Sequence, residues 1–166
     1  VTHDQEEALV MSDRVVLMNH GAIVQDGPPQ LVYRSPRTRF AATFLGEAIL
    51  LEGPLERGVD TAVVAADGLR LLLRGPIDGS PGTAIVCLRP ERVAITAGTA
   101  EAGPNRASGT VATVVFLGSV VRYVVDVGSR ELLVEQPAGD GLIPFEPGAE
   151  VVVSWDDDAC VVVEDD

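Results

Sequence analysis

From residue 47 to its end, the chain consists of short apolar runs rich in valine, isoleucine and leucine. Turn-forming residues such as glycine, proline and aspartate separate most of them, and this alternation is typical of strands joined by tight connections. The runs are AILLEG, TAVVAA, LRLLLR, TAIVCL, RVAIT, GTVATVVFLG, VVRYVVDV, ELLVEQ, AEVVVSW and CVVVED. The sequence therefore predicts a mostly β fold for residues 47–166.

Turn signals refine this prediction. Asp67-Gly68 between two runs is a strong hairpin signal, and Gly118 inside a strand-like run indicates a bulge or a sharp bend. The last five runs, from Gly109 onward, follow one another closely. Five short strands curled over one core match the strand number of a small OB-like β-barrel. Residues 97–109 are the best linker candidate, and no repeat of 20–50 residues marks a solenoid.

Residues 1–46 differ, because helical and strand patterns alternate there. A β-hairpin is expected around His20-Gly21, and Pro28-Pro29 is expected to open a helix that breaks at Ser35-Pro36. The expected helical stretches are QEEALVMS, PPQLVYR and TRFAATFLG, and the expected strands are RVVLMN and AIVQDG. This short stretch reads as α/β.

The opening nonapeptide, VTHDQEEAL, holds the strongest candidate for a functional residue. Asp4 and Glu7 fit a capping box, so His3 stands between a strand end and a helix start. In α/β folds this junction holds residues that touch phosphate. The alternative is a solvated histidine beside a helix cap.

Charge limits the classes of partner. The 166 residues include 12 basic residues, all of them arginine, against 25 acidic ones, and the net charge is −13. Such a chain repels phosphate backbones and anionic lipid, which argues against nucleic-acid binding and against docking on lipid. No apolar run reaches the roughly 18 residues of a membrane helix, and no leader of the secretory type is indicated.

Both cysteines lie in apolar runs, Cys87 in AIVCL and Cys160 in ACVVV. Their positions do not follow the spacing of metal ligands. We expect two buried free thiols in a reducing compartment.

The first 53 residues, from VTHDQEEAL to FLGEAILLEG, resemble the end of the nucleotide-binding domain of ABC importer ATP-binding subunits, in the subgroup for polyamine, iron, sulfate and sugar uptake. By this resemblance His3 is the H-loop switch residue. It would be catalytic and would contact the γ-phosphate of ATP in the full-length subunit. ATP and Mg²⁺ would be the cofactors of that subunit, which is an ABC-type transport ATPase, and no metal ligand is assigned to this chain.

The motifs RPERV, FLGSVVRY and VSWDDDACVVV resemble the TOBE-type (transport-associated OB) regulatory domain of the same subunits. The resemblance implies two domains, with residues 1–46 as the remnant of the nucleotide-binding domain and 47–166 as the regulatory domain. It also implies a homodimer through the regulatory domain, membrane-spanning partner subunits, and a place on the cytoplasmic face of the cell membrane. FLGEAILLEG and VFLGSVVRY look most like the polyamine and iron(III) proteins.

The chain departs from the family in one way that bears on catalysis. A phosphate-binding loop of the form G-x-x-x-x-G-K-[ST] needs a lysine, and this sequence has none. The signature and Walker B motifs precede the histidine motif in the family. We therefore expect a C-terminal fragment of a longer subunit, one that alone neither binds ATP usefully nor hydrolyses it.

Two other functions remain open. A stand-alone OB-like sensor of a small ligand could hold an oxyanion in a nest of backbone amides, or a polyamine through its acidic charge. An OB-type oligonucleotide-binding domain is the remote alternative, because lysines are absent and aromatic residues are few.

Several polar motifs have both a functional and a structural reading. Glu6 and Glu7 are general-base candidates or acids that complement a helix dipole. Arg89-Pro90-Glu91 is a ligand clamp or a turn with structural hydrogen bonds between strands and around Pro90. Asp156–Asp158 is a metal site or a turn, and three consecutive acids do not converge on one ion.

The aromatic residues Tyr123 and Trp155 could stack on a base or a sugar ring. Packing in the core is the alternative, and it is the default for so few aromatic residues. The acidic end of the chain, 164–166, is expected to be solvated.

Overall fold

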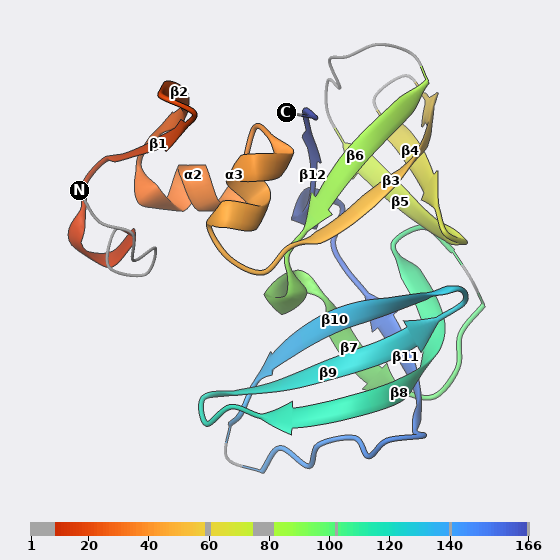
Figure 1. Ribbon diagram of the computed structural model, residues 1–166. Coiled ribbons are helices and arrows are strands. Elements are labelled where there is room, and N and C mark those ends of the chain that lie inside the picture. The colour runs from red at the N-terminus through yellow and green to blue at the C-terminus, as the bar shows by residue number, and fades with distance from the viewer. Residues whose placement is uncertain (1–8, 59–60, 75–81, 102, 140, 166) are drawn as a thin grey trace.

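The computed structural model describes residues 9–58, 61–74, 82–101, 103–139 and 141–165. Two curled β-sheets form the bulk of the molecule, and a hairpin with two short helices lies to one side of them (Figure 1). The mostly β, OB-like prediction is confirmed. No helix among the described residues is long and apolar enough to cross a bilayer.

The N-terminal elements form as the turn chemistry predicts. Strands β1 (Val15–Asn19) and β2 (Ala22–Gly27) pair as an antiparallel hairpin around His20-Gly21. Helix α2 (Pro29–Arg34) begins at the proline pair, and α3 (Arg39–Phe44) begins after Thr38, whose side chain caps it by accepting from the Ala41 N–H. Of the expected helix 5–12, residues 9–12 are described; 9–11 are helical and the helix ends before Ser12.

Every strand expected after residue 47 is present. The first group is β3 (Ile49–Arg57), β4 (Thr61–Ala66), β5 (Leu69–Arg74), β6 (Thr83–Leu88) and β7 (Ala94–Ala97). The second is β8 (Arg106–Phe116), β9 (Val120–Val127), β10 (Arg130–Pro137), β11 (Glu150–Ser154) and β12 (Cys160–Val163). The 3₁₀ turns η1 (Pro90–Arg92) and η2 (Asp157–Ala159) precede β7 and β12.

The way these strands combine corrects one expectation. The last five runs do not form one five-stranded sheet, because the sheet orders are β12-β6-β3-β4-β5 and β10-β9-β8-β11-β7. Each sheet curls into a half-barrel. The half-barrel of β3, β4, β5 and β6 takes β12 as its fifth strand, and the half-barrel of β8, β9, β10 and β11 takes β7. The turns η1 and η2 redirect the chain after β6 and β11, so that β7 pairs with β11 and β12 pairs with β6.

The two half-barrels are structural repeats that the sequence pattern did not reveal. The first part of β3 pairs with β6 and its last part with β4. Strand β8 divides in the same way between β11 and β9. A glycine lies in each long strand near the point where its pairing changes from one neighbour to the other. A Cβ on Gly53 would lie 2.0 Å from the Ala65 oxygen, and one on Gly109 would lie 2.6 Å from the Asp126 oxygen. Both strands need glycine there because the neighbouring backbone comes so close.

The remaining turn and linker predictions hold with one refinement. Asp67-Gly68 forms the tight turn between β4 and β5. Gly118, with φ +84°, makes the bend between β8 and β9, whereas the bulge in this pair falls between Val111 and Thr113. The linker is shorter than expected, because β8 already begins at Arg106.

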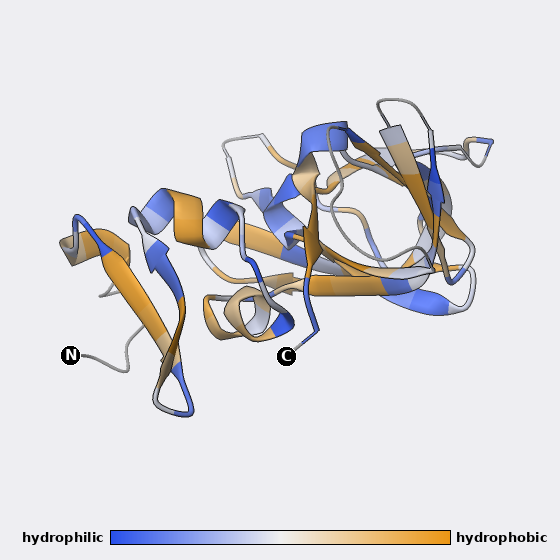
Figure 2. Ribbon diagram, turned by 90° about the horizontal axis from the view of Figure 1, so that it is seen from above, coloured by the Kyte–Doolittle hydropathy of each residue, from blue (hydrophilic) through white to orange (hydrophobic). Residues whose placement is uncertain are grey.

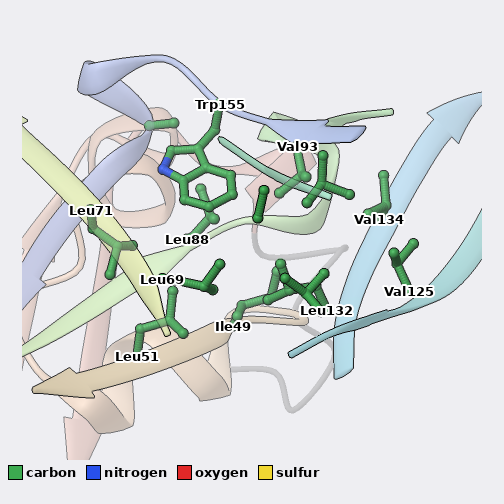
Figure 3. Close-up of a cluster of buried hydrophobic side chains, with 14 of the residues drawn as sticks. Ile49, Leu51, Leu69, Leu71, Leu88, Val93, Val125, Leu132, Val134 and Trp155 are labelled. Carbon is green, nitrogen blue, oxygen red and sulfur yellow. The ribbon is translucent and has the colours of Figure 1, made fainter. Parts of the chain in front are cut away.

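One continuous core joins the half-barrels. Figure 3 shows side chains of both halves meeting below Trp155, and Figure 2, seen from above, shows the strands of the barrels coloured largely hydrophobic. The largest fully buried members are Tyr123, Leu51, Leu71, Leu73, Leu88 and Leu132. The shared core and the exchanged strands make the two half-barrels a single packing unit.

Candidate functional site

His3, the predicted catalytic and ATP-contacting residue, lies outside the described residues, as do Glu6 and Glu7. The described residues place a different group at the junction between the helices and the barrels. That group is the Arg89-Pro90-Glu91 motif, which follows β6.

Arg89 is a buried cation surrounded by backbone carbonyls. Its Nη1 donates to the oxygens of Ala42 at 2.9 Å, Glu47 at 2.8 Å and Gly46 at 3.2 Å, and its Nη2 donates to the Tyr33 oxygen at 3.3 Å. Only 5% of the residue is exposed. Tyr33 and Ala42 lie in the last turns of α2 and α3, and Gly46 and Glu47 follow α3, so the arginine binds helix C-terminal carbonyls and the segment after them.

The aromatic ring of Tyr33 completes this junction. The Arg89 guanidinium carbon lies 4.3 Å from the ring centroid, and the Tyr33 hydroxyl donates to Glu91 Oε1 at 2.7 Å. Burial, and then the hydrogen bond and charge of Glu91, raise the pKa of Tyr33 to about 12. The hydroxyl therefore stays protonated as a donor at neutral pH. The motif is a turn with backbone hydrogen bonds around Pro90, as expected, but its side-chain bonds run to α2, α3 and the segment after α3 rather than between strands.

Four further hydrogen bonds tie the N-terminal elements together and to the barrels. The buried Gln25 amide donates to the Ser35 oxygen at 2.9 Å and accepts from the Arg37 N–H at 3.0 Å. After β12, the Glu164 N–H donates to the Arg37 oxygen at 2.8 Å, and its oxygen accepts from the Arg39 N–H at 2.9 Å. Hairpin, helices and the last strand therefore meet around the α2–α3 connection.

A hollow of about 570 Å³ opens between α2 and the barrels, beside this junction. Its polar walls include Tyr33, Arg34, Glu91 and the exposed ion pair of Arg92 with Asp158, at 2.7 Å. Both signs of charge are present, so the walls do not select one class of ligand.

Two of the acids of 156–158 that could suggest a metal site have other partners. Asp157 pairs with Arg74 and accepts from Asn105 Nδ2 at 2.9 Å, and Asp158 pairs with Arg92. These contacts hold η2 against β5 and η1. No cluster of metal-ligand type occurs among the residues that the structure describes.

The aromatic candidates and the cysteines are structural. Tyr123 and Trp155 are buried in the shared core, so neither offers a face to a base or a sugar. Cys87 and Cys160 are free thiols, as expected, although Cys160 is only half-buried. Burial raises the pKa of the Cys160 thiol to about 12, so it is a poor nucleophile at neutral pH.

Asn105 is a key residue that the sequence analysis missed. Its φ is +55° and it is 6% exposed. Its side chain accepts from Leu72 N at 2.8 Å and donates to the Leu72 oxygen at 3.2 Å, while its backbone oxygen accepts from Trp155 N at 3.1 Å. The Pro104-Asn105 dipeptide before a strand was the available signal for such a turn.

Both 3₁₀ turns lie in a part of the chain that is similar to a known domain family. Residues 86–163, from β6 through β12, match the family model of the TOBE domain. Over this stretch the chain is similar to the TOBE domain. This match covers η1 with Glu91 and η2 with the 156–158 acids, so both turns that exchange the fifth strands lie inside the matched segment.

Two curated relatives match almost the whole chain. It is 38% identical to the spermidine/putrescine import ATP-binding protein PotA of Rubrobacter xylanophilus over 98% of this chain and 44% of the relative. It is 36% identical to the putrescine transport ATP-binding protein PotG of Escherichia coli over 98% of this chain and 45% of the relative. The chain thus spans less than half the length of these relatives.

The fold also has a solved counterpart. The cytoplasmic molybdate-binding protein ModG, in a crystal form with molybdate bound, matches with a TM-score of 0.50 over 69% of this chain and 94% of ModG. Sequence identity is 14%, so this likeness concerns the OB-like fold alone.

Proposed function

We propose that the chain is the C-terminal portion of the ATP-binding subunit of an ABC importer, of the polyamine type. Residues 1–46 are the last elements of its nucleotide-binding domain, and residues 47–166 are its regulatory domain. The observation that carries this proposal is the match to PotA and PotG along 98% of the chain, together with the TOBE domain. Iron(III) is the alternative solute class.

The exposed apolar surface of the N-terminal elements supports the proposal. Val10, Met11, Met18, Ile23 and Leu31 are each more than half exposed. Apolar side chains gathered on one small unit mark a contact surface. We assign this surface to the rest of the nucleotide-binding domain of the subunit.

The Arg89 junction gives this portion a mechanical role. Because Arg89 and Tyr33 lock α2 and α3 onto η1, a shift of the helices carries the TOBE domain with it. Regulatory domains that stay paired as a homodimer also keep two catalytic halves at high effective concentration. The proposed position is the cytoplasmic face of the membrane, against membrane-spanning subunits.

His3 is the proposed ATP contact in the full-length subunit, where Mg²⁺ and ATP are the cofactors. In the assembled transporter, His3→Ala is expected to lower the rate of ATP hydrolysis about 100-fold, since one oriented contact to the transferring phosphate has this magnitude. Assembly and nucleotide binding are expected to persist. Unchanged hydrolysis would remove His3 from the proposal.

Affinity purification tests the proposed partners. The tagged protein, isolated from detergent-solubilised membranes of its host, is expected to bring down membrane-spanning import subunits. The comparison variant carries the double substitution Ile23→Glu with Met18→Glu. These changes place charge on the apolar surface and are expected to weaken assembly. Recovery of the tagged protein without membrane subunits would contradict the importer proposal.

A further inference from the structure

The connection between β10 and β11 is irregular, and its part nearest β11, residues 141–149, is named the strap here. Figure 1 shows the strap running below β8, along the second half-barrel, which β8 to β11 form. Pro144 and Pro147 lie within it, and a proline has no N–H to give to a ladder. The strap therefore lies beside β8 without becoming a strand of the sheet.

Few backbone hydrogen bonds fasten the strap. The Gly148 N–H donates to the Val111 oxygen at 2.7 Å, and the Val111 N–H donates to the Ala149 oxygen at 3.0 Å. Among the described residues, its other backbone bonds are local, from the Leu142 N–H to the Gly139 oxygen and within the strap itself. Strands β9 and β10, by contrast, pair along their whole length. A segment with so few backbone bonds opens more readily than a ladder does.

Two apolar side chains hold the strap against the core. Leu142 and Phe145 are partly buried and pack on the core that both half-barrels share. The Phe145 ring centroid lies 6.0 Å from that of Tyr123, with the ring planes inclined at 59°. Ile143, which lies between them in the chain, is 87% exposed and adds little to this contact. The strap is thus a cover that is fastened at Val111 and by two side chains.

The core residue that Phe145 contacts carries an unpaired polar group. Tyr123 is 0% exposed, and its hydroxyl has no hydrogen-bond partner among the described residues. Gln136 Oε1, near the end of β10 and on the same face of the sheet as Tyr123, is likewise buried without a partner. An unpaired buried polar group raises the free energy of the closed state, because it gains a hydrogen bond as soon as water reaches it.

We propose that the strap is a lid, which opens by releasing Phe145 from Tyr123 and its own bonds to Val111 while both half-barrels stay folded. The weak fastening and the unpaired Tyr123 hydroxyl favour the open state, and the apolar contacts of Leu142 and Phe145 favour the closed one. One wall of the second half-barrel then has two states. Binding at another site shifts them only if it distinguishes open from closed. The lid goes beyond the proposed import function and does not depend on it.

Native-state hydrogen exchange of the 166-residue chain tests the opening. We expect the N–H groups of Gly148 and Val111 to exchange through local opening. Their exchange is expected to be faster than that of the slowest amides in the β9–β10 ladder and independent of low concentrations of urea. Exchange of both groups only together with that ladder would overturn the lid.

The variant Tyr123→Phe tests the part that the hydroxyl plays. It keeps a ring against Phe145 but has no hydroxyl to hydrate, so exchange at Gly148 is expected to be about tenfold slower. Tyr33→Phe is the matched control, because the Tyr33 hydroxyl bonds to Glu91 at the Arg89 junction, and it is expected to leave exchange at Gly148 unchanged. Unchanged exchange in Tyr123→Phe would overturn the inference, since the hydroxyl would then not reach water on opening.

Thiol labelling follows the opening from inside the half-barrel. Val134, opposite Tyr123 in the β9–β10 pair, and Val64 of the other half-barrel are both 0% exposed. In native buffer, Val134→Cys is expected to react with a thiol reagent faster than Val64→Cys, and the parent chain with Cys87 and Cys160 gives the background rate. Equal rates for the two variants would contradict a lid on the second half-barrel. The importer proposal is judged separately, by the recovery of membrane-spanning subunits.

Discussion

At the scale of single residues, the buried Arg89 is the group on which the junction depends most. One guanidinium serves carbonyls at the ends of two helices and stacks on Tyr33. Removing it takes the guanidinium donor from one buried and three part-buried hydrogen bonds, and the desolvation of their carbonyls is then less well compensated.

We expect Arg89→Met to lower the free energy of unfolding by about 3 kcal/mol, since breaking a buried charged network has this magnitude. Arg92→Met, three positions along in the same turn, removes only an exposed ion pair and is expected to cost less than about 1 kcal/mol. Urea denaturation of the two variants measures the difference. Equal losses would show that the junction carries no special stability.

Tyr33 makes the free energy of unfolding decrease with rising pH in the alkaline range. Its pKa is raised from the usual 10 to about 12, because burial and Glu91 disfavour the phenolate. The fold therefore gains stability from the protonated hydroxyl, fully below pH 10, and this gain is lost as pH rises from 10 to 12.

We expect the free energy of unfolding of Tyr33→Phe to fall less steeply than that of the parent between pH 10 and 12. The Cys160 thiol, whose pKa is also raised to about 12, contributes equally to both proteins. Denaturation at stepped pH values gives the two profiles. Parallel profiles would contradict the assignment to Tyr33.

At the scale of elements, the strands and turns could be predicted, but their partners could not. Alternation and turn residues located all ten strands of the half-barrels and the Asp67-Gly68 turn. The exchange of β7 and β12 depends on where η1 and η2 send the chain, and no local pattern reports that direction. The partners of Arg89 likewise lie more than 40 residues away in the chain.

Gly53 and Gly109 show what the repeat requires of its long strands. Gly53→Ala and Gly109→Ala are each expected to lower the free energy of unfolding by about 2–3 kcal/mol, because the new Cβ would overlap backbone or packed side chains. Gly139→Ala is the control, since no atom lies within 4 Å of its Cβ position, and it is expected to be nearly neutral. Thermal denaturation compares the three, and a neutral Gly109→Ala would contradict the close approach.

At the scale of the whole molecule, exchanged strands and a shared core make the half-barrels interdependent. We expect one cooperative transition in which the fluorescence of Trp155, the single tryptophan, coincides with loss of β circular dichroism. Calorimetric and van't Hoff enthalpies are expected to agree. Two resolved transitions would contradict a single packing unit.

Of the candidate site, the sequence could predict the local motifs but not the long-range contacts. The sequence motifs pointed to the TOBE domain, and residues 86–163 confirm it. His3 lies outside the described residues, and the junction that the structure does describe is built from long-range contacts that single motifs do not encode.

The central claim is that this chain serves ATP-driven import of polyamines. Uptake of labelled spermidine and putrescine, measured in host cells that lack the gene and in the same cells with the gene restored, tests it most directly. We predict that the deletion lowers uptake of one or both polyamines and that the restored gene recovers it, while uptake of iron(III) is unchanged. Polyamine uptake that is the same with and without the gene would contradict the claim.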